Sequence, residues 1–105
     1  MSDATTLDVD VSDLAPGEMR AIEHAGVSVL LCNVEGRIHA VENLCSHAAV
    51  PLSEGVLKGC ELECELHGAV FDVRTGEAVA LPARWPIRTF AVDQQGDRVR
   101  VTLKR

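Results

Sequence analysis

The chain has 105 residues and a formal net charge of −6, so it forms one domain with a modest core and has no room for a second catalytic domain. The excess of acidic residues argues against nucleic-acid binding, because proteins of that class use basic patches to displace counterions. Hydrophobic residues make up 47% of the chain, yet it contains only two Phe, one Trp and no Tyr, so we expect a core of Val, Leu, Ile and Ala, which favours strands.

The first ten residues contain neither a basic segment nor an apolar run, and no stretch of the sequence is apolar enough over a sufficient length to cross a bilayer. We therefore expect a soluble, cytoplasmic protein that binds neither membrane nor nucleic acid. Four Cys in an acidic chain of this kind indicate metal ligation or buried thiols rather than a disulfide framework.

Short segments of alternating apolar and polar residues, bounded by Gly, Asn, Asp and Pro, predict a series of strands. In chain order these are Leu7–Val11, Met19–Glu23, Val27–Val34, Ile38–Val41, Cys60–Cys64, Ala69–Asp72, Arg88–Asp93 and Arg98–Leu103. Hairpin turns are predicted at Glu35-Gly36 and at 94–97. At most one helical turn is expected, near Ser12–Leu14. The pattern predicts an all-β fold, either an antiparallel sandwich or a partly open barrel.

Two short motifs, Cys45-Ser-His47 and Cys64-Glu-Leu-His67, each combine one thiol with one imidazole and are separated by 16 residues. Together they predict a four-ligand metal site. Zinc fingers normally pair like ligands within each motif, whereas here each motif is mixed. This arrangement is typical of an iron–sulfur cluster with Cys on one iron and His on the other. A structural zinc site remains the alternative.

The remaining Cys and His residues receive no functional role. Cys32 lies in an apolar run, as a buried core thiol would. Cys60 is on the same predicted strand face as Cys64 but roughly 13 Å away at strand spacing, too far to share a metal with it. His24 and His39 lie in predicted strands without a neighbouring Cys.

The segments around the two motifs resemble the cluster-binding region of Rieske-type ferredoxins. The stretches that carry the resemblance are 43–47, 51–55 and 63–77. In length, and in sequence as far as Val92, the chain is similar to the ferredoxin components of bacterial aromatic-ring-hydroxylating dioxygenase systems.

This resemblance implies a single Rieske domain over 1–105, with base strands in about 1–42 and 84–105 and an inserted cluster-binding subdomain in about 43–83. It also implies one 2Fe-2S cluster held by Cys45, His47, Cys64 and His67, with a third loop containing Pro82 over the cluster. The implied role is electron transfer from an NAD(P)H-dependent flavin reductase to a terminal Rieske oxygenase. No catalytic residue and no bound organic substrate are expected, so the chain itself is not predicted to be an enzyme.

The resemblance also bears on the reduction potential and on a competing role. High-potential Rieske proteins carry an extra Cys in each ligand loop, and this chain has Val50 and Leu66 at those positions. Together with the acidic Glu65, this predicts a potential near the low end of the range of roughly −150 to +300 mV for such clusters. A Rieske-fold small subunit of a nitrite-reductase-like enzyme is the alternative within the same fold, although relatives of that type usually lack the ligands.

Overall fold

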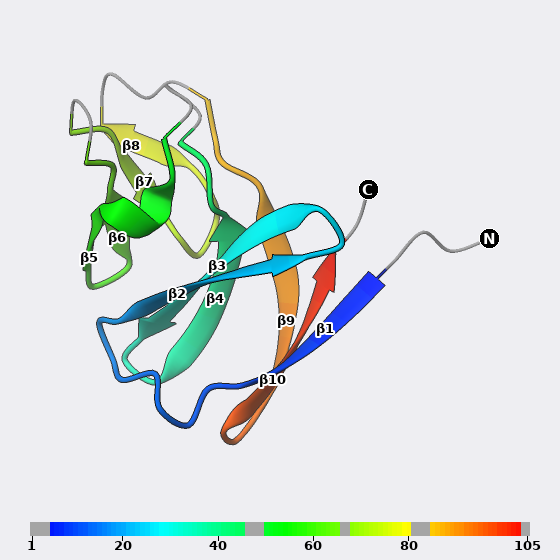
Figure 1. Cartoon of the computed structure of the whole chain (residues 1–105). Helices are drawn as coiled ribbons and strands as arrows, with labels where there is room; N and C mark the ends of the chain where they lie inside the picture. Colours follow the sequence, from blue (N-terminus) through cyan, green and yellow to red (C-terminus); the bar gives the residue numbers. More distant parts are fainter. Residues whose placement is uncertain (1–4, 46–49, 66–67, 81–84, 104–105) are drawn as a thin grey trace.

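The computed structural model describes residues 5–45, 50–65, 68–80 and 85–103. These residues form strands and one single-turn 3-10 helix, so the predicted all-β fold is confirmed (Figure 1). The elements are β1 (Thr5–Asp10), β2 (Met19–His24), β3 (Val27–Val34), β4 (Arg37–Glu42), η1 (Leu52–Glu54), β5 (Val56–Lys58), β6 (Glu61–Glu63), β7 (Val70–Asp72), β8 (Ala78–Ala80), β9 (Thr89–Gln95) and β10 (Arg98–Leu103).

Six of the strands form a curled antiparallel sheet in the order β1-β10-β9-β4-β3-β2 (Figure 1). The predicted turn at Glu35-Gly36 joins β3 to β4, and both residues have positive φ, 54° and 95°. Positive φ at both central residues is the mark of the tight hairpin turn whose twist matches that of the flanking strands.

The other four strands form a second antiparallel sheet in the order β5-β6-β7-β8. The sequence prediction omitted β5 and β8. The strands β6 and β7 are equally short, but they lie within the predicted segments Cys60–Cys64 and Ala69–Asp72. The helical turn expected near Ser12–Leu14 is a hydrogen-bonded turn, in which the Leu14 N–H donates to the Val11 carbonyl at 3.0 Å. The helical turn of the structure is η1 instead.

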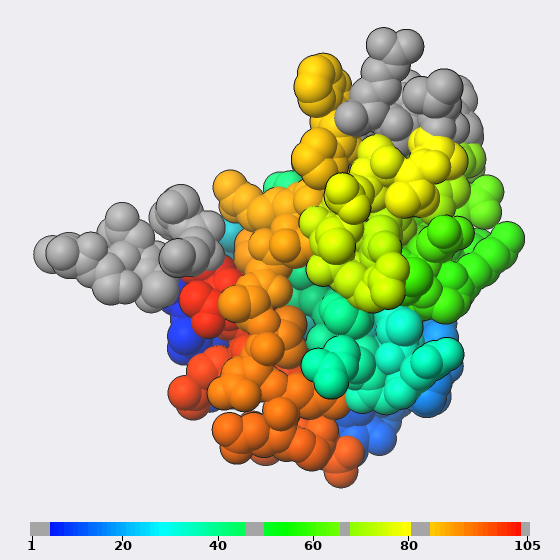
Figure 2. All heavy atoms as spheres, turned by 180° about the vertical axis from the view of Figure 1, so that it is seen from behind, coloured from blue at the N-terminus to red at the C-terminus, as the bar shows by residue number. Residues whose placement is uncertain are grey.

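Residues of the second sheet all lie between 56 and 80, inside the range 43–83 expected for an inserted subdomain. The division into base and subdomain stays a prediction. Figure 2 shows the yellow-green residues of β7 and β8 lying directly against the orange segment before β9 and the β3–β4 hairpin. The two sheets are therefore packed together.

Strand β3 is buried on both faces and forms the wall between two hydrophobic clusters. Leu30 and Cys32 point into one cluster, which extends to the second sheet, while Val29 and Leu31 point into the other, which fills the curled sheet. All four side chains are 0% exposed. This placement explains the apolar run Val29–Cys32 within β3, because a stretch covered on both sides needs no alternation. Burial also raises the pKa of the Cys32 thiol to about 12, as expected for an inert core cysteine.

Asn33 is the buried polar residue at the end of β3. Its Nδ2 donates to the Leu14 carbonyl at 2.7 Å, and its Oδ1 accepts from the Gly36 N–H at 2.8 Å. Both ends of the amide are thus satisfied, as a buried polar group requires. No helix in the described ranges is long and apolar enough to cross a membrane.

Candidate metal centre

Cys45 follows β4 and begins the first predicted ligand loop. Its backbone N–H donates to the carbonyl of Val50 at 2.9 Å, which closes the loop five residues later. Val50 leads through Pro51 into η1, whose Leu52 is 0% exposed. The loop is therefore fixed on one side by the curled sheet and on the other by a buried leucine.

Cys64 follows β6 and begins the second predicted ligand loop, which has the same closure. Its N–H donates to the carbonyl of Ala69 at 2.6 Å, again five residues later. Gly68 has a φ of 71°, a conformation that glycine adopts without the cost of a Cβ, and it turns the chain back into β7. Each loop is thus closed by the same kind of backbone hydrogen bond, from the Cys N–H to the carbonyl five residues later. The spacing between Cys and His differs by one residue between the two loops.

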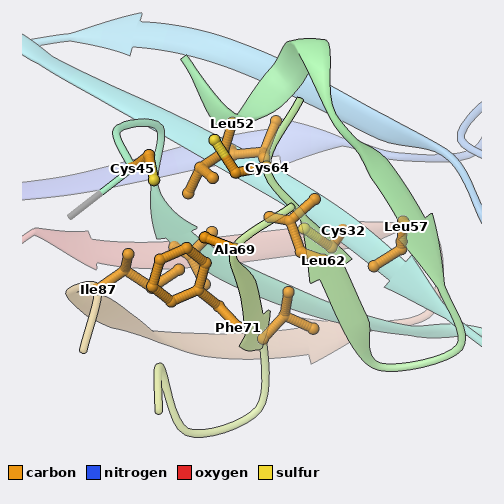
Figure 3. Packing of buried hydrophobic residues seen from close by; sticks show 12 residues of the cluster. Cys32, Cys45, Leu52, Leu57, Leu62, Cys64, Ala69, Phe71 and Ile87 are labelled. Carbon is orange, nitrogen blue, oxygen red and sulfur yellow. The ribbon is translucent and has the colours of Figure 1, made fainter. Parts of the chain in front are cut away.

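Both cysteines lie in the hydrophobic cluster between the two sheets. Cys45 is 3% exposed and Cys64 0%, and each keeps its thiol in the structure. Figure 3 shows them on two separate loops, with Leu52, Ala69 and Ile87 in the same cluster. Buried thiol donors on two equally closed loops in apolar surroundings fit an iron–sulfur cluster, whose ligands are Cys thiolates in a site with little solvent.

The two predicted histidine ligands, His47 and His67, lie outside the described residues. Within the described part of the chain, no group of three or more His, Cys, Asp or Glu residues could hold a metal ion. The structure therefore places half of the predicted ligand set, and the complete set of Cys45, His47, Cys64 and His67 stays a prediction.

A third segment, residues 85–88, joins this region before β9. The Ile87 N–H donates to the Gly76 carbonyl at 2.8 Å, and Ile87, which is 5% exposed, packs in the same cluster as both cysteines. Two residues earlier, Trp85 is 69% exposed. Pro82, predicted to lie over the cluster, falls outside the described residues.

Strand β6 separates apolar from acidic side chains, as its alternation predicts. Leu62 and Cys64 are 0% exposed, and the half-buried Cys60 packs against the same cluster. On the other face Glu61 and Glu65 are exposed, and Glu63 lies 3.5 Å from the Lys58 ammonium. The carboxylates thus lie on the side of β6 that faces away from the core.

His39, which received no role from the sequence, lies half-buried on β4. Desolvation lowers its pKa, and the positive charges of Arg37 and Arg74 lower it further. It belongs to the contact between the two sheets, since Asp72 of β7 is among the charges that act on it.

Asn43 is a residue of this region that sequence reasoning missed. It precedes Cys45 by two positions and hydrogen-bonds to Ser28, 15 residues away, and to Ser53, 10 residues away. No local pattern signals such contacts, because they depend on how β3 and η1 meet in the fold.

Comparison with known proteins gives a consistent result. A family model described as "Rieske [2Fe-2S] domain" matches residues 5–91. The chain is 52% identical over 92 residues to the ferredoxin component of biphenyl 2,3-dioxygenase from Rhodococcus jostii (strain RHA1), covering 88% of this chain and 86% of the relative. It is 39% identical to the ferredoxin component of the naphthalene 1,2-dioxygenase system from Pseudomonas aeruginosa, covering 90% and 91% of the two chains.

Two solved structures from carbazole 1,9a-dioxygenase share this fold over nearly the whole chain. The ferredoxin of carbazole 1,9a-dioxygenase from Nocardioides aromaticivorans IC177 superposes with a TM-score of 0.88 and 34% identity, covering 96% of this chain and 99% of its own. A chain from the complex of reduced oxygenase and oxidized ferredoxin in carbazole 1,9a-dioxygenase has a TM-score of 0.89 and 32% identity, covering 95% and 94%.

Proposed function

Because the chain belongs to the Rieske [2Fe-2S] domain family, we propose that it is the ferredoxin of a bacterial aromatic-ring-hydroxylating dioxygenase system and carries single electrons to a terminal oxygenase. The observation that carries this proposal is the pair of buried cysteines on two loops with identical closure. The family supplies the cofactor, a Rieske-type 2Fe-2S cluster. The proteins named as ferredoxin components among its relatives are electron carriers rather than catalysts.

In this proposal Cys45 and Cys64 hold one iron, and His47 and His67 hold the other. When bound, the cluster supplies reversible one-electron transfer at a higher potential than an all-cysteine cluster, since neutral imidazoles replace two thiolates. The protein's own residues keep the cysteine side dry: Leu52, Leu62 and Phe71 are all 0% exposed within the shared core. No residue is assigned a catalytic role, and no organic substrate is expected to bind.

The proposed partners are a flavin-containing, NAD(P)H-dependent ferredoxin reductase as donor and a terminal Rieske oxygenase as acceptor, both in the cytoplasm. The structure of the complex of reduced oxygenase and oxidized ferredoxin in carbazole 1,9a-dioxygenase supports the proposal that the electron acceptor is an oxygenase. The reductase and the direction of transfer rest on the resemblance to such systems.

The surface beside the ligand loops suits a brief contact with such partners. Leu44, next to Cys45, is 43% exposed, and Trp85, next to the buried Ile87 segment, is 69% exposed. Exposed aromatic and aliphatic side chains of this kind favour transient protein–protein contact. The net charge of −6 would steer the approach of a positively charged partner.

Ligand variants test the proposal directly. Purified under anaerobic conditions and reduced, the wild-type protein should give the visible and paramagnetic signals of a Rieske cluster, which a zinc site cannot give. His47→Ala and His67→Ala should abolish the paramagnetic signal, because a methyl group supplies no metal ligand. A colourless wild-type protein containing zinc would overturn the proposal.

Cys60→Ser and Cys32→Ala are the matched controls and should keep the signal. Cys60 lies on the same side of the strand as Cys64 and packs against the same hydrophobic cluster. Its replacement therefore tests whether any cysteine near the site is needed, or only the two predicted ligands. Loss of the signal in Cys60→Ser together with its survival in His47→Ala would show that the ligand assignment is wrong.

A further inference from the structure

Asn43 ties three segments of the chain together beside the first ligand loop. Its backbone N–H donates to the Ser28 carbonyl at 3.0 Å. Its Nδ2 lies 3.2 Å from the Ser28 hydroxyl and 3.3 Å from the Ser53 hydroxyl, and its Oδ1 accepts from the Ser53 N–H at 2.8 Å. Asn43 therefore joins the start of β3 to η1.

These contacts add a second closure to the loop that begins with Cys45. The inner closure is the bond from the Cys45 N–H to the Val50 carbonyl at 2.9 Å, and the outer closure is the pairing of Asn43 with Ser53. Between them the chain passes into Leu52, which is buried in the core that also holds both cysteines. The backbone at Cys45 is thus held from β3 on one side and from η1 on the other.

Asn33 shows what a purely structural asparagine looks like in the same strand system. It is 6% exposed and bonds to Leu14 and Gly36 at the far end of β3. Loss of either asparagine removes hydrogen bonds to partners that stay in place, which destabilises a fold. Only Asn43 is connected to a ligand loop.

We propose that Asn43 is a positioning residue of the metal centre, which holds the backbone at Cys45 in the geometry that retains the cluster. This inference rests on the ligand set of the proposed function. Residues that orient metal ligands from the outer shell typically contribute about 10–100-fold to metal retention, and Asn43 is placed to do so through its contacts with Ser28 and Ser53.

The test compares cluster release and the paramagnetic signature in matched variants of the holoprotein. In Asn43→Ala, release to a chelator, followed by the decay of visible absorbance, should be about 10–100-fold faster than in the wild type, and the g-values of the reduced cluster should shift. Asn33→Ala should unfold at lower denaturant but keep the wild-type release rate and g-values.

Asn43→Asp is the conservative rescue. It keeps an acceptor for the Ser53 N–H, and its second oxygen can accept from the Ser28 and Ser53 hydroxyls, which can donate as well as accept. Its release rate should therefore return close to that of the wild type.

Two results with Asn43→Ala would overturn the proposal. One is a wild-type release rate and wild-type g-values in Asn43→Ala. The other is faster release in both Asn43→Ala and Asn33→Ala, in proportion to the stability that each variant loses. If Asn43→Ala does not fold, Ser28→Ala removes one of the bonds alone; faster release supports the proposal and unchanged release overturns it. A wild-type protein without a cluster signal would instead contradict the proposed function.

Discussion

Glu65 is one of the two acidic residues that flank the predicted thiolate ligand Cys64 in the sequence, the other being Glu63. Glu65 follows Cys64 directly and is exposed, so its carboxylate opposes the negative charge that reduction adds to the site. Glu65→Gln should raise the midpoint potential, but by less than about 59 mV, the value of a tenfold change in a one-electron equilibrium, because solvent screens an exposed charge. Voltammetry on the purified variant measures the shift.

Glu61→Gln is the control for this prediction. Glu61 is also exposed on β6 but lies three residues before Cys64, so its removal should raise the potential less. Both shifts should shrink at high salt, which screens exposed charges. A potential that stays constant or falls in Glu65→Gln, with an unaltered visible spectrum, would show that this carboxylate does not lower the potential.

At the scale of elements, Gly76 holds the segment before β9 against the second sheet. It is buried with a φ of 84°, and a Cβ at this position would overlap the carbonyl oxygen of Ile87. Gly76→Ala should therefore lower the free energy of unfolding by more than the roughly 1–2 kcal/mol that a left-handed conformation costs an ordinary residue. Urea denaturation followed by circular dichroism measures the loss.

Gly26→Ala separates the two causes of that loss. Gly26 has a similar φ of 78°, but a Cβ there would meet nothing within 4 Å. Its substitution should cost only the conformational part, so Gly76→Ala should be clearly the more destabilising of the two. Equal losses in both variants would mean that the segment at Ile87 shifts without cost.

The long strands could be predicted from the sequence, because alternation and turn residues are local signals. Val27–Val34 and Arg98–Leu103 were predicted with the bounds that the structure has. β5 and β8 could not, since their pairing depends on β6 and β7, which lie between them in the sheet. η1 likewise owes its place to the packing of Leu52 in a core that only the folded chain assembles.

The candidate site divides in the same way. Cys45 and Cys64 are predicted as metal ligands from the spacing of the two motifs, because a metal site needs ligands at short, defined separations in the chain. The side-chain bonds of Asn43 to Ser28 and Ser53 join residues 15 and 10 positions apart, and the contact of Ile87 with Gly76 joins two loops. Such supporting contacts follow from the meeting of the sheets and leave no local pattern.

At the scale of the whole molecule, acidic side chains with lowered pKa occur in both sheets. The pKa of Asp8 is lowered chiefly by its hydrogen bond from Arg100, that of Asp13 by Arg20 and that of Asp72 by Arg74. Backbone hydrogen bonding from Ser12 does the same for Asp10. Each carboxylate thus favours the folded state when it is ionised.

His39 also makes the folded state less stable as pH falls, but at a higher pH than the aspartates do. Its pKa is lowered from 6.5, first by desolvation and then by Arg37 and Arg74, so the folded state prefers the neutral imidazole. The stability linked to a lowered pKa is complete above the unfolded-state pKa and is lost as pH falls through the folded-state value. His39 therefore costs stability below about pH 6.5, and the aspartates cost stability below about pH 4.

Stability should accordingly fall in two stages as the protein is acidified. In urea unfolding from pH 8 to pH 3, His39→Gln should remove the first stage, because glutamine does not titrate, so the variant gains on the wild type between pH 8 and pH 5. Asp72→Asn should be less stable than the wild type at pH 7, since it weakens the ion pair with Arg74. The gap should narrow as pH falls below about 4, because the stability linked to the lowered pKa of Asp72 is lost there. Acid also affects a bound cluster, but equally in wild type and variant, so this effect cancels in the difference between their free energies of unfolding. A gap between His39→Gln and the wild type that stays constant from pH 8 to pH 5 would show that His39 does not link protonation to folding.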